Sequence, residues 1–203
     1  MYRKITLHLV VLSFISVLSI FSLSASAIVL EAIPSDTSVS VGDELSVELV
    51  ISGLEQSPLD EVVRAYHLDL AFDASIFSAS SVVFGDFVGL NHPLASLLQA
   101  VDLSMPGNVM IEEVSLFGDD VLALAQPDSF VLASINFTTI GAGESAMTFL
   151  PYLDFGIDIK GRGAQILSVD VIGASFNSVP EPASLYLLGV GLLILVGRTK
   201  NNS

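Results

Sequence analysis

Apolar residues recur at every second position through much of the chain, and this pattern restricts the possible folds more than any other feature. Leu45, Val47, Leu49 and Ile51 alternate with mainly polar residues. Successive side chains of a β-strand point to opposite faces, so such a segment buries one face and exposes the other. Further strands are predicted around residues 39–41, 66–73, 80–84, 109–117, 130–140, 146–150 and 166–176.

Turn-forming residues separate these segments, and no long amphipathic helix interrupts them. Gly42-Asp43 gives a turn, and residues 53–60, which include Pro58, give a loop. Residues 94–101 and 119–126 are predicted to form one or two helical turns each. About eight strands with turns between them predict an all-β fold, an antiparallel jelly-roll β-sandwich.

The first 27 residues have the layout of a secretory signal peptide. Two basic residues precede an apolar run, and the segment ends on Ala-Ser-Ala. A basic start, an apolar stretch and small residues at a cleavage site are together typical of exported proteins. We therefore predict cleavage before Ile28, after the small residues Ala25 and Ala27. An uncleaved N-terminal anchor is the alternative.

Acidic residues dominate the segment between the two ends of the chain. The full sequence has a formal charge of -15. Residues 28–179 hold 21 acidic side chains and only three basic ones, Arg64, Lys160 and Arg162. Such a surface repels the phosphate backbone of nucleic acids, which are thereby excluded as partners. The chain has no cysteine, but a domain of about 150 residues buries enough surface to fold without disulfides.

The last 25 residues combine a rigid tripeptide, a short apolar stretch and a basic tip. The Pro-Glu-Pro tripeptide at 180–182 cannot join the interior of a helix or sheet, because proline lacks the N–H donor. Residues 183–197 carry no charge. As a helix they would reach roughly 22 Å, less than a hydrocarbon core of about 30 Å. The basic tip at 198–200 can extend to the headgroups, so a marginal transmembrane helix with a cytoplasmic C-terminus is predicted.

This tail resembles the PEP-CTERM sorting signal of Gram-negative bacteria. The resemblance rests on Pro180, Glu181 and Pro182, on the Leu- and Gly-containing apolar stretch, and on the basic tip with Arg198 and Lys200. It implies export by the secretion machinery, transient membrane insertion and recognition by exosortase, a membrane-embedded cysteine protease or transpeptidase. It also implies a final place at the cell surface or in the extracellular matrix, in association with exopolysaccharide and biofilm. An ordinary C-terminal anchor is the alternative.

The segment between the two ends resembles a cohesin domain from about residue 33 to residue 176. Val41-Gly42-Asp43 before an alternating strand, and the stretch Ala-Tyr-His-Leu-Asp-Leu-Ala-Phe-Asp at 65–73, resemble the opening of a cohesin. Segments 120–122 and 126–133 resemble the region after a central strand in cohesin-like PEP-CTERM proteins. The resemblance implies non-catalytic binding, since cohesins bind dockerin modules through a sheet face and share their fold with carbohydrate-binding modules.

Three segments are therefore expected: a signal peptide (1–27), a cohesin-like β-sandwich domain (28–178) and a sorting signal (179–203). The domain is expected to bind a partner, either a dockerin-like or other surface protein or exopolysaccharide. A purely structural surface protein without a discrete ligand fits the sequence as well.

Few residues suggest catalysis. The histidines after the signal segment are His67 and His92. A Ser-His-Asp set can be imagined around His67 and Asp69, but such sets are assembled from distant segments, so closeness in sequence is no support. We predict no catalytic residues and no enzyme activity. A secreted polysaccharide-active enzyme that uses two carboxylates is the alternative.

Carboxylates and aromatic residues give weak indications of ligands. Glu112 and Glu113 would point to opposite faces of a strand, and Asp119-Asp120 would begin a helical turn. The loop spacing of an EF-hand calcium site is absent, so no cofactor is predicted, with a structural calcium ion as the alternative. Tyr66 and Tyr152 are the tyrosines of the central segment, and the chain has no tryptophan. Stacking on sugar rings, and hence a direct carbohydrate-binding module, therefore has little support.

Overall fold

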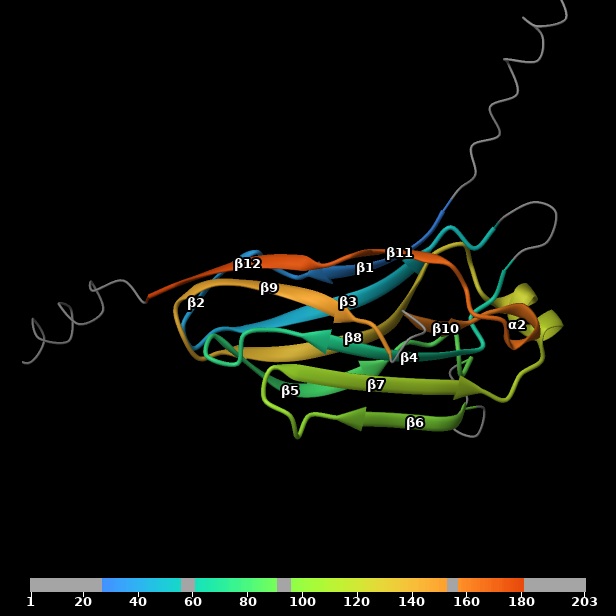
Figure 1. Ribbon diagram of the computed structural model, residues 1–203, viewed down its shortest axis with the longest axis horizontal. Helices are drawn as coiled ribbons and strands as arrows, with labels where there is room; N and C mark the ends of the chain where they lie inside the picture. The colour runs from blue at the N-terminus through green and yellow to red at the C-terminus, as the bar shows by residue number, and fades with distance from the viewer. Residues whose placement is uncertain (1–26, 56–60, 91–95, 153–156, 181–203) are drawn as a thin grey trace, which may run out of the picture.

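The first of two facing β-sheets holds the N-terminal strand. The computed structural model describes residues 27–55, 61–90, 96–152 and 157–180 (Figure 1). In the first sheet the strands follow the order β11-β1-β3-β8-β5. These strands are β1 (Ile28–Pro34), β3 (Glu44–Ser52), β5 (Phe77–Phe84), β8 (Phe130–Thr139) and β11 (Val169–Ile172).

The second sheet has the order β2-β12-β9-β4-β7-β6, and β10 pairs with β4 beside it. Its strands are β2 (Ser38–Ser40), β4 (Ala65–Ala71), β6 (Ser96–Asp102), β7 (Asn108–Ser115), β9 (Gly143–Leu150), β10 (Asp158–Lys160) and β12 (Ala174–Val179). Helix α2 (Asp119–Ala125) and the short 3-10 helix η1 (Arg162–Ala164) complete the described elements. The strand pairs are antiparallel except β1 with β11 and β12 with β2. The predicted all-β sandwich is thus confirmed, with parallel pairing at two edges.

Apolar side chains from both sheets form one core between them. The four alternating apolar residues of β3 are all at most 4% exposed, as the period of two predicts. Three buried rings connect the sheets: Phe137 of β8, Phe77 of β5 and Phe176 of β12. The Phe77 ring lies 6.3 Å from Phe137 and 5.3 Å from Phe176, both edge-on. Such edge-to-face pairs add to the free energy gained by burial.

The predicted helical turns at 94–101 are wrong, because the described part of this stretch belongs to β6. This strand pairs antiparallel with β7, and its register shifts between Ser96 and Leu98. β6 is an edge strand, and Leu98 and Val101, which face opposite sides, are 41% and 38% exposed. An edge strand that exposes both faces has no clear period of two, so pairing with β7 decides its conformation. The other predicted helical stretch, 119–126, is confirmed as α2.

The single strand predicted at 166–176 is two strands in different sheets. β11 pairs with β1 in the first sheet, whereas β12 pairs with β9 in the second. Gly173 lies between them, and a Cβ atom there would be 2.3 Å from the carbonyl oxygen of Met147. Only glycine allows so close a backbone approach, so the chain changes sheets at this residue.

β1 begins at the same end of the sandwich as α2, and β12 ends at the opposite end (Figure 1). No helix among the described residues is both long and apolar enough to cross a membrane. Residues 1–26 of the predicted signal peptide lie outside the described residues, as does the predicted membrane helix at 183–197.

Candidate binding face

The outer face of β9, β10, β4, β7 and β6 gathers polar side chains opposite the core, and we call it the β4–β7 face. On β4, His67 and Asp69 point outward. They alternate with Tyr66, Leu68 and Leu70, which are buried. This arrangement confirms the two faces predicted for the strand. Strand register sets His67 beside Glu112 of β7 and Asp158 of β10. Segments far apart in the sequence therefore meet around one histidine.

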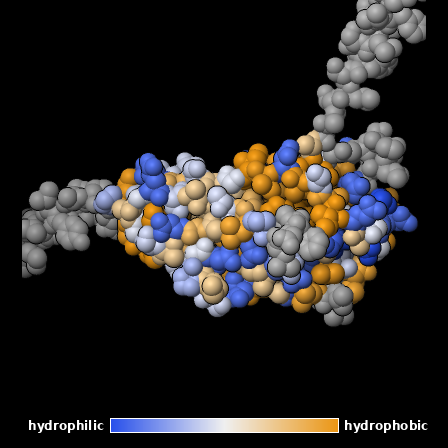
Figure 2. All heavy atoms as spheres, in the orientation of Figure 1, coloured by the Kyte–Doolittle hydropathy of each residue, from blue (hydrophilic) through white to orange (hydrophobic). Residues whose placement is uncertain are grey.

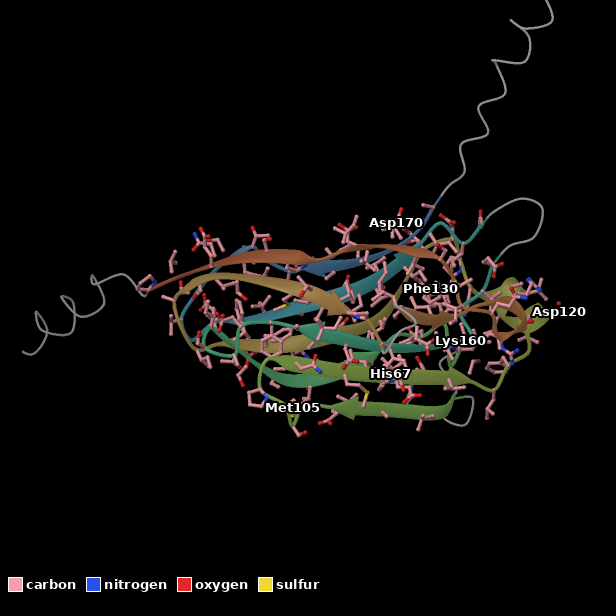
Figure 3. All side chains as sticks on the ribbon, viewed as in Figure 1. His67, Met105, Asp120, Phe130, Lys160 and Asp170 are labelled. Atoms are coloured by element: carbon pink, nitrogen blue, oxygen red, sulfur yellow. The ribbon has the colours of Figure 1, made fainter. Side chains whose placement is uncertain are left out.

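His67 lies on the β4–β7 face (Figure 3), and two carboxylates flank its ring. Its Nε2 lies 3.3 Å from Oδ2 of Asp69, and its Nδ1 lies 3.8 Å from Oε2 of Glu112. The ring also packs against Tyr152, with 4.1 Å between the ring centroids. A catalytic histidine needs one ring nitrogen directed at a nucleophile. Both ring nitrogens of His67 face carboxylates, so these contacts do not include the serine of a Ser-His-Asp set.

The β4–β7 face also exposes apolar side chains. Leu98 of β6 and Leu150 of β9 are each 41% exposed, and Leu150 pairs with Asp69 in the register. Asn108 donates a hydrogen bond of 3.0 Å from Nδ2 to Oδ1 of Asp69, which orients that carboxylate. The face therefore presents both apolar and charged side chains to solvent.

A second polar cluster lies at the α2 end of the sandwich (Figure 2). Arg64 Nε lies 3.3 Å from Oδ1 of Asp119, and Arg162 Nη1 lies 3.6 Å from Oδ1 of Asp120. Oδ2 of Asp119 accepts a hydrogen bond of 2.9 Å from the backbone N–H of Gly163. The first-turn position predicted for both aspartates is confirmed, and there they also interact favourably with the helix N-terminus. The cluster thereby ties α2 to η1.

An open hollow of about 750 Å³ adjoins this cluster, and its lining includes Glu61, Asp120, Arg162 and Gln165. Oε2 of Glu61 accepts a hydrogen bond of 3.3 Å from the backbone N–H of Arg162. The carboxylates of the hollow are thus engaged with the η1 turn and the arginines. Among the described residues, no group of three or more His, Asp or Glu could hold a metal ion.

A polar row runs across β4, β7 and β6 on the inner face, and its members Tyr66 and Glu113 are buried. The Tyr66 hydroxyl lies 3.1 Å from Oε2 of Glu113 and 3.0 Å from the carbonyl oxygen of Leu132. Gln99 donates from Nε2 to Oε1 of Glu113 at 2.8 Å. Burial, and next the charge of Glu113, raise the pKa of Tyr66 well above its usual value. Tyr66 is therefore a structural residue and cannot stack on a sugar.

Glu112 and Glu113 lie on opposite faces of β7, as predicted. Of the residues predicted to take part in processing, Ala27, Ile28 and Pro180 are described. Ile28 begins β1 and pairs with Val169, and Pro180 follows β12 directly and is exposed. The remaining predicted residues lie outside the described ranges: Ala25, Glu181, Pro182, Arg198 and Lys200, together with His92.

The interactions that sequence reasoning missed include the Arg64–Asp119 pair and the approach of Glu112 to His67. Both join segments that are distant in the sequence. Only the first has a sequence signal: Arg64 is one of three basic residues in a strongly acidic domain, so a carboxylate partner was to be expected.

Comparisons with known proteins identify the tail and the fold separately. The family model described as the PEP-CTERM protein-sorting motif matches residues 178–201. No curated protein matches the sequence. Solved cohesins match the folded part at low sequence identity.

Three of these cohesins illustrate the similarity. CaCohA2 of Clostridium acetobutylicum, solved in a complex with CaDoc0917, is 20% identical, with a TM-score of 0.57 over 75% of this chain and 99% of that one. A non-cellulosomal cohesin of the archaeon Archaeoglobus fulgidus is 14% identical, with a TM-score of 0.56 over 79% and 96% of the two chains. The sixth cohesin of Acetivibrio cellulolyticus scaffoldin B, solved with a Cel5 dockerin mutant, is 12% identical, with a TM-score of 0.57 over 75% and 99%.

These similarities establish the fold of the domain and the identity of the tail. The predicted resemblance to both is confirmed. The chain thus carries a PEP-CTERM sorting motif at residues 178–201, joined to a β-sandwich of the cohesin fold.

Proposed function

We propose that this protein is exported from a Gram-negative bacterium, is sorted by an exosortase and then presents a non-catalytic binding domain outside the inner membrane. The observation that carries the proposal is the continuity between the cohesin-fold sandwich and the sorting motif. β12 ends at Val179, and the motif match spans residues 178–201. A signal peptide cleaved between Ala27 and Ile28 would supply the export step, and the binding domain would then comprise residues 28–178.

The binding domain uses the β4–β7 face in this proposal. Cohesins are non-catalytic modules that bind dockerins through a sheet face, which the sequence resemblance implies for this chain. The face carries Asp69, Glu112 and Asp158, and the Lys160 ammonium is paired with Asp158. An acidic face attracts and orients a partner of opposite charge. The partner is therefore a dockerin-like or other surface protein that presents basic side chains.

The experiment compares charge reversals on the two sheets. Glu112→Lys changes the β4–β7 face, whereas the matched control Glu48→Lys changes an exposed position on β3 in the other sheet. Each variant is immobilised, and its affinity for the protein that the wild type retains from the host's extracellular fraction is measured. We expect Glu112→Lys to weaken binding by about tenfold or more and Glu48→Lys to change it little. Equal affinities for all three proteins would show that the face is not the site.

The final location of the protein is the surface or the extracellular matrix, in association with exopolysaccharide and biofilm. This part of the proposal comes from the resemblance to PEP-CTERM proteins. Tyr66 is buried and the ring of Tyr152 packs on His67, so these two tyrosines do not form a stacking platform for sugars. Association with polysaccharide would therefore pass through the processed end of the chain or through a bound partner. Retention of the host's exopolysaccharide by the isolated domain would contradict this route.

A further inference from the structure

The sorting motif begins inside the folded sheet. The motif match starts at Ser178, and this residue is part of β12 and only 3% exposed. Ser178 pairs with Gly143 of β9 on one side and with Val39 of β2 on the other. The sorting motif and the sandwich therefore overlap at Ser178 and Val179.

No spacer separates the sandwich from the Pro-Glu-Pro tripeptide. Val179 pairs with Ser40, its carbonyl oxygen accepts a hydrogen bond of 3.2 Å from the N–H of Val41, and Pro180 is the next residue. The membrane helix predicted from the sequence begins at residue 183. An enzyme embedded in the membrane would therefore meet the tripeptide directly against the end of a folded domain.

The end of β12 pairs with β9 on one side and with β2 on the other, and the N–H of Asn177 donates a hydrogen bond of 2.9 Å to the carbonyl oxygen of Thr37. The outer of these partners, β2, has three residues and is the last strand of this sheet in the described part of the chain. The buried hydroxyl oxygens of Ser178 and of Thr139 have no hydrogen-bond partner, and Thr139 lies at the same end, because its backbone bonds to Gly42 and Asp43. Buried hydroxyls without a partner reduce stability. Short edge pairing and unpaired hydroxyls together favour local opening at this end.

Phe176 marks the point where such opening would stop. It is 3% exposed and its ring packs on Phe77, so it is anchored in the core. Asn177, Ser178 and Val179 follow this anchor, and none of them contributes a large side chain to the buried core. Three extended residues reach about 10 Å, which is more than the headgroup layer on one side of a bilayer, roughly 6 Å.

We propose that residues 177–179 form a latch that must detach from β2 and β9 before the sorting enzyme can process the tail. When the latch is closed, Pro180 directly follows a paired strand. When it is open, it becomes the extended spacer that carries the tripeptide to the enzyme. This proposal depends on the proposed sorting by exosortase. It adds opening of the latch as the step that limits the rate of processing.

A disulfide lock in the full chain tests the latch in the native host. Ser38 and Asn177 are partners across β2 and β12 and both are exposed. Partners on neighbouring strands lie within disulfide range, and the periplasm oxidises such pairs. The double variant Ser38→Cys with Asn177→Cys is compared with each single variant by pulse-chase analysis of the full-length precursor. We expect conversion at least about tenfold slower for the oxidised double variant, and wild-type rates for the single variants and after reduction.

A spacer separates the latch from other causes. Six Gly and Ser residues inserted between Val179 and Pro180 supply a reach of roughly 20 Å without opening the sheet. We expect this insertion to restore conversion of the locked protein. Wild-type conversion of an oxidised double variant, or a block that the spacer does not relieve, would overturn the latch. If the host converted neither the variants nor the wild-type precursor, the proposed sorting itself would be overturned.

Discussion

Replacing Phe137 with alanine should lower the free energy of unfolding of the domain by about 3–5 kcal/mol. Phe137 is fully buried in β8, and its ring lies 5.1 Å from that of Phe72 and 6.3 Å from that of Phe77. The substitution removes the transfer energy of the ring and leaves a cavity between the two sheets. Because single domains are stable by only about 5–15 kcal/mol, the loss is a large part of the total. Urea unfolding of residues 28–179, followed by far-ultraviolet circular dichroism, measures it.

The matched control is Leu124→Ala on α2, where the side chain is 92% exposed. This change should alter the free energy of unfolding by less than about 0.5 kcal/mol, as is usual for surface substitutions. If Phe137→Ala and Leu124→Ala had the same small effect, the ring would not connect the sheets as described. If the free energy of unfolding of Phe137→Ala depended less steeply on urea concentration, a change in the denatured state would be indicated instead.

Replacing Pro180, Glu181 and Pro182 together with alanine should abolish processing without affecting the fold. Proline fixes the backbone and lacks a donor, so the natural tripeptide keeps the chain extended before the apolar stretch. Three alanines favour continuation of a helix and remove both the extended shape and the carboxylate. Cells expressing the variant should retain the full-length chain in the inner membrane fraction. Fractionation and immunoblotting of the native host measure the distribution.

Two controls accompany the alanine variant. Lys200→Arg keeps the charge of the basic tip and should be processed like the wild type, because either residue anchors the tail at the headgroups. The isolated domain, which lacks the tail altogether, should unfold at the same urea concentration as the processed protein. Normal processing of the triple-alanine variant would show that the tripeptide is not what the enzyme reads.

The central strands were predictable because their two faces have different environments. β3, β4 and β8 each bury one face in the core, so a period of two in the sequence maps onto the structure. The first strand, β1, was not predicted. Val29 and Ile33 add apolar residues to its outer face, which blurs the alternation. β10 has three residues, too few to show any period.

The predictable part of the candidate site was the side of each strand on which its residues lie. His67 and Asp69 share the outer face of β4, and Glu112 and Glu113 separate on β7, as the alternation predicts. Which residue lies opposite which depends on strand register, and register is set by turns and packing that a local pattern does not contain. The approach of Glu112 to His67 and the buried contact of Tyr66 with Glu113 therefore appear only in the structure.

The most direct test of the account is the intact mass and the location of the protein in its native host, with and without the exosortase gene. With the gene, we expect a mature chain that begins near Ile28, ends near the Pro-Glu-Pro tripeptide and is found outside the inner membrane. Without the gene, the C-terminal tail should remain and the protein should stay in the inner membrane. A full-length tail in the inner membrane in both strains would contradict sorting and leave the tail as a simple anchor.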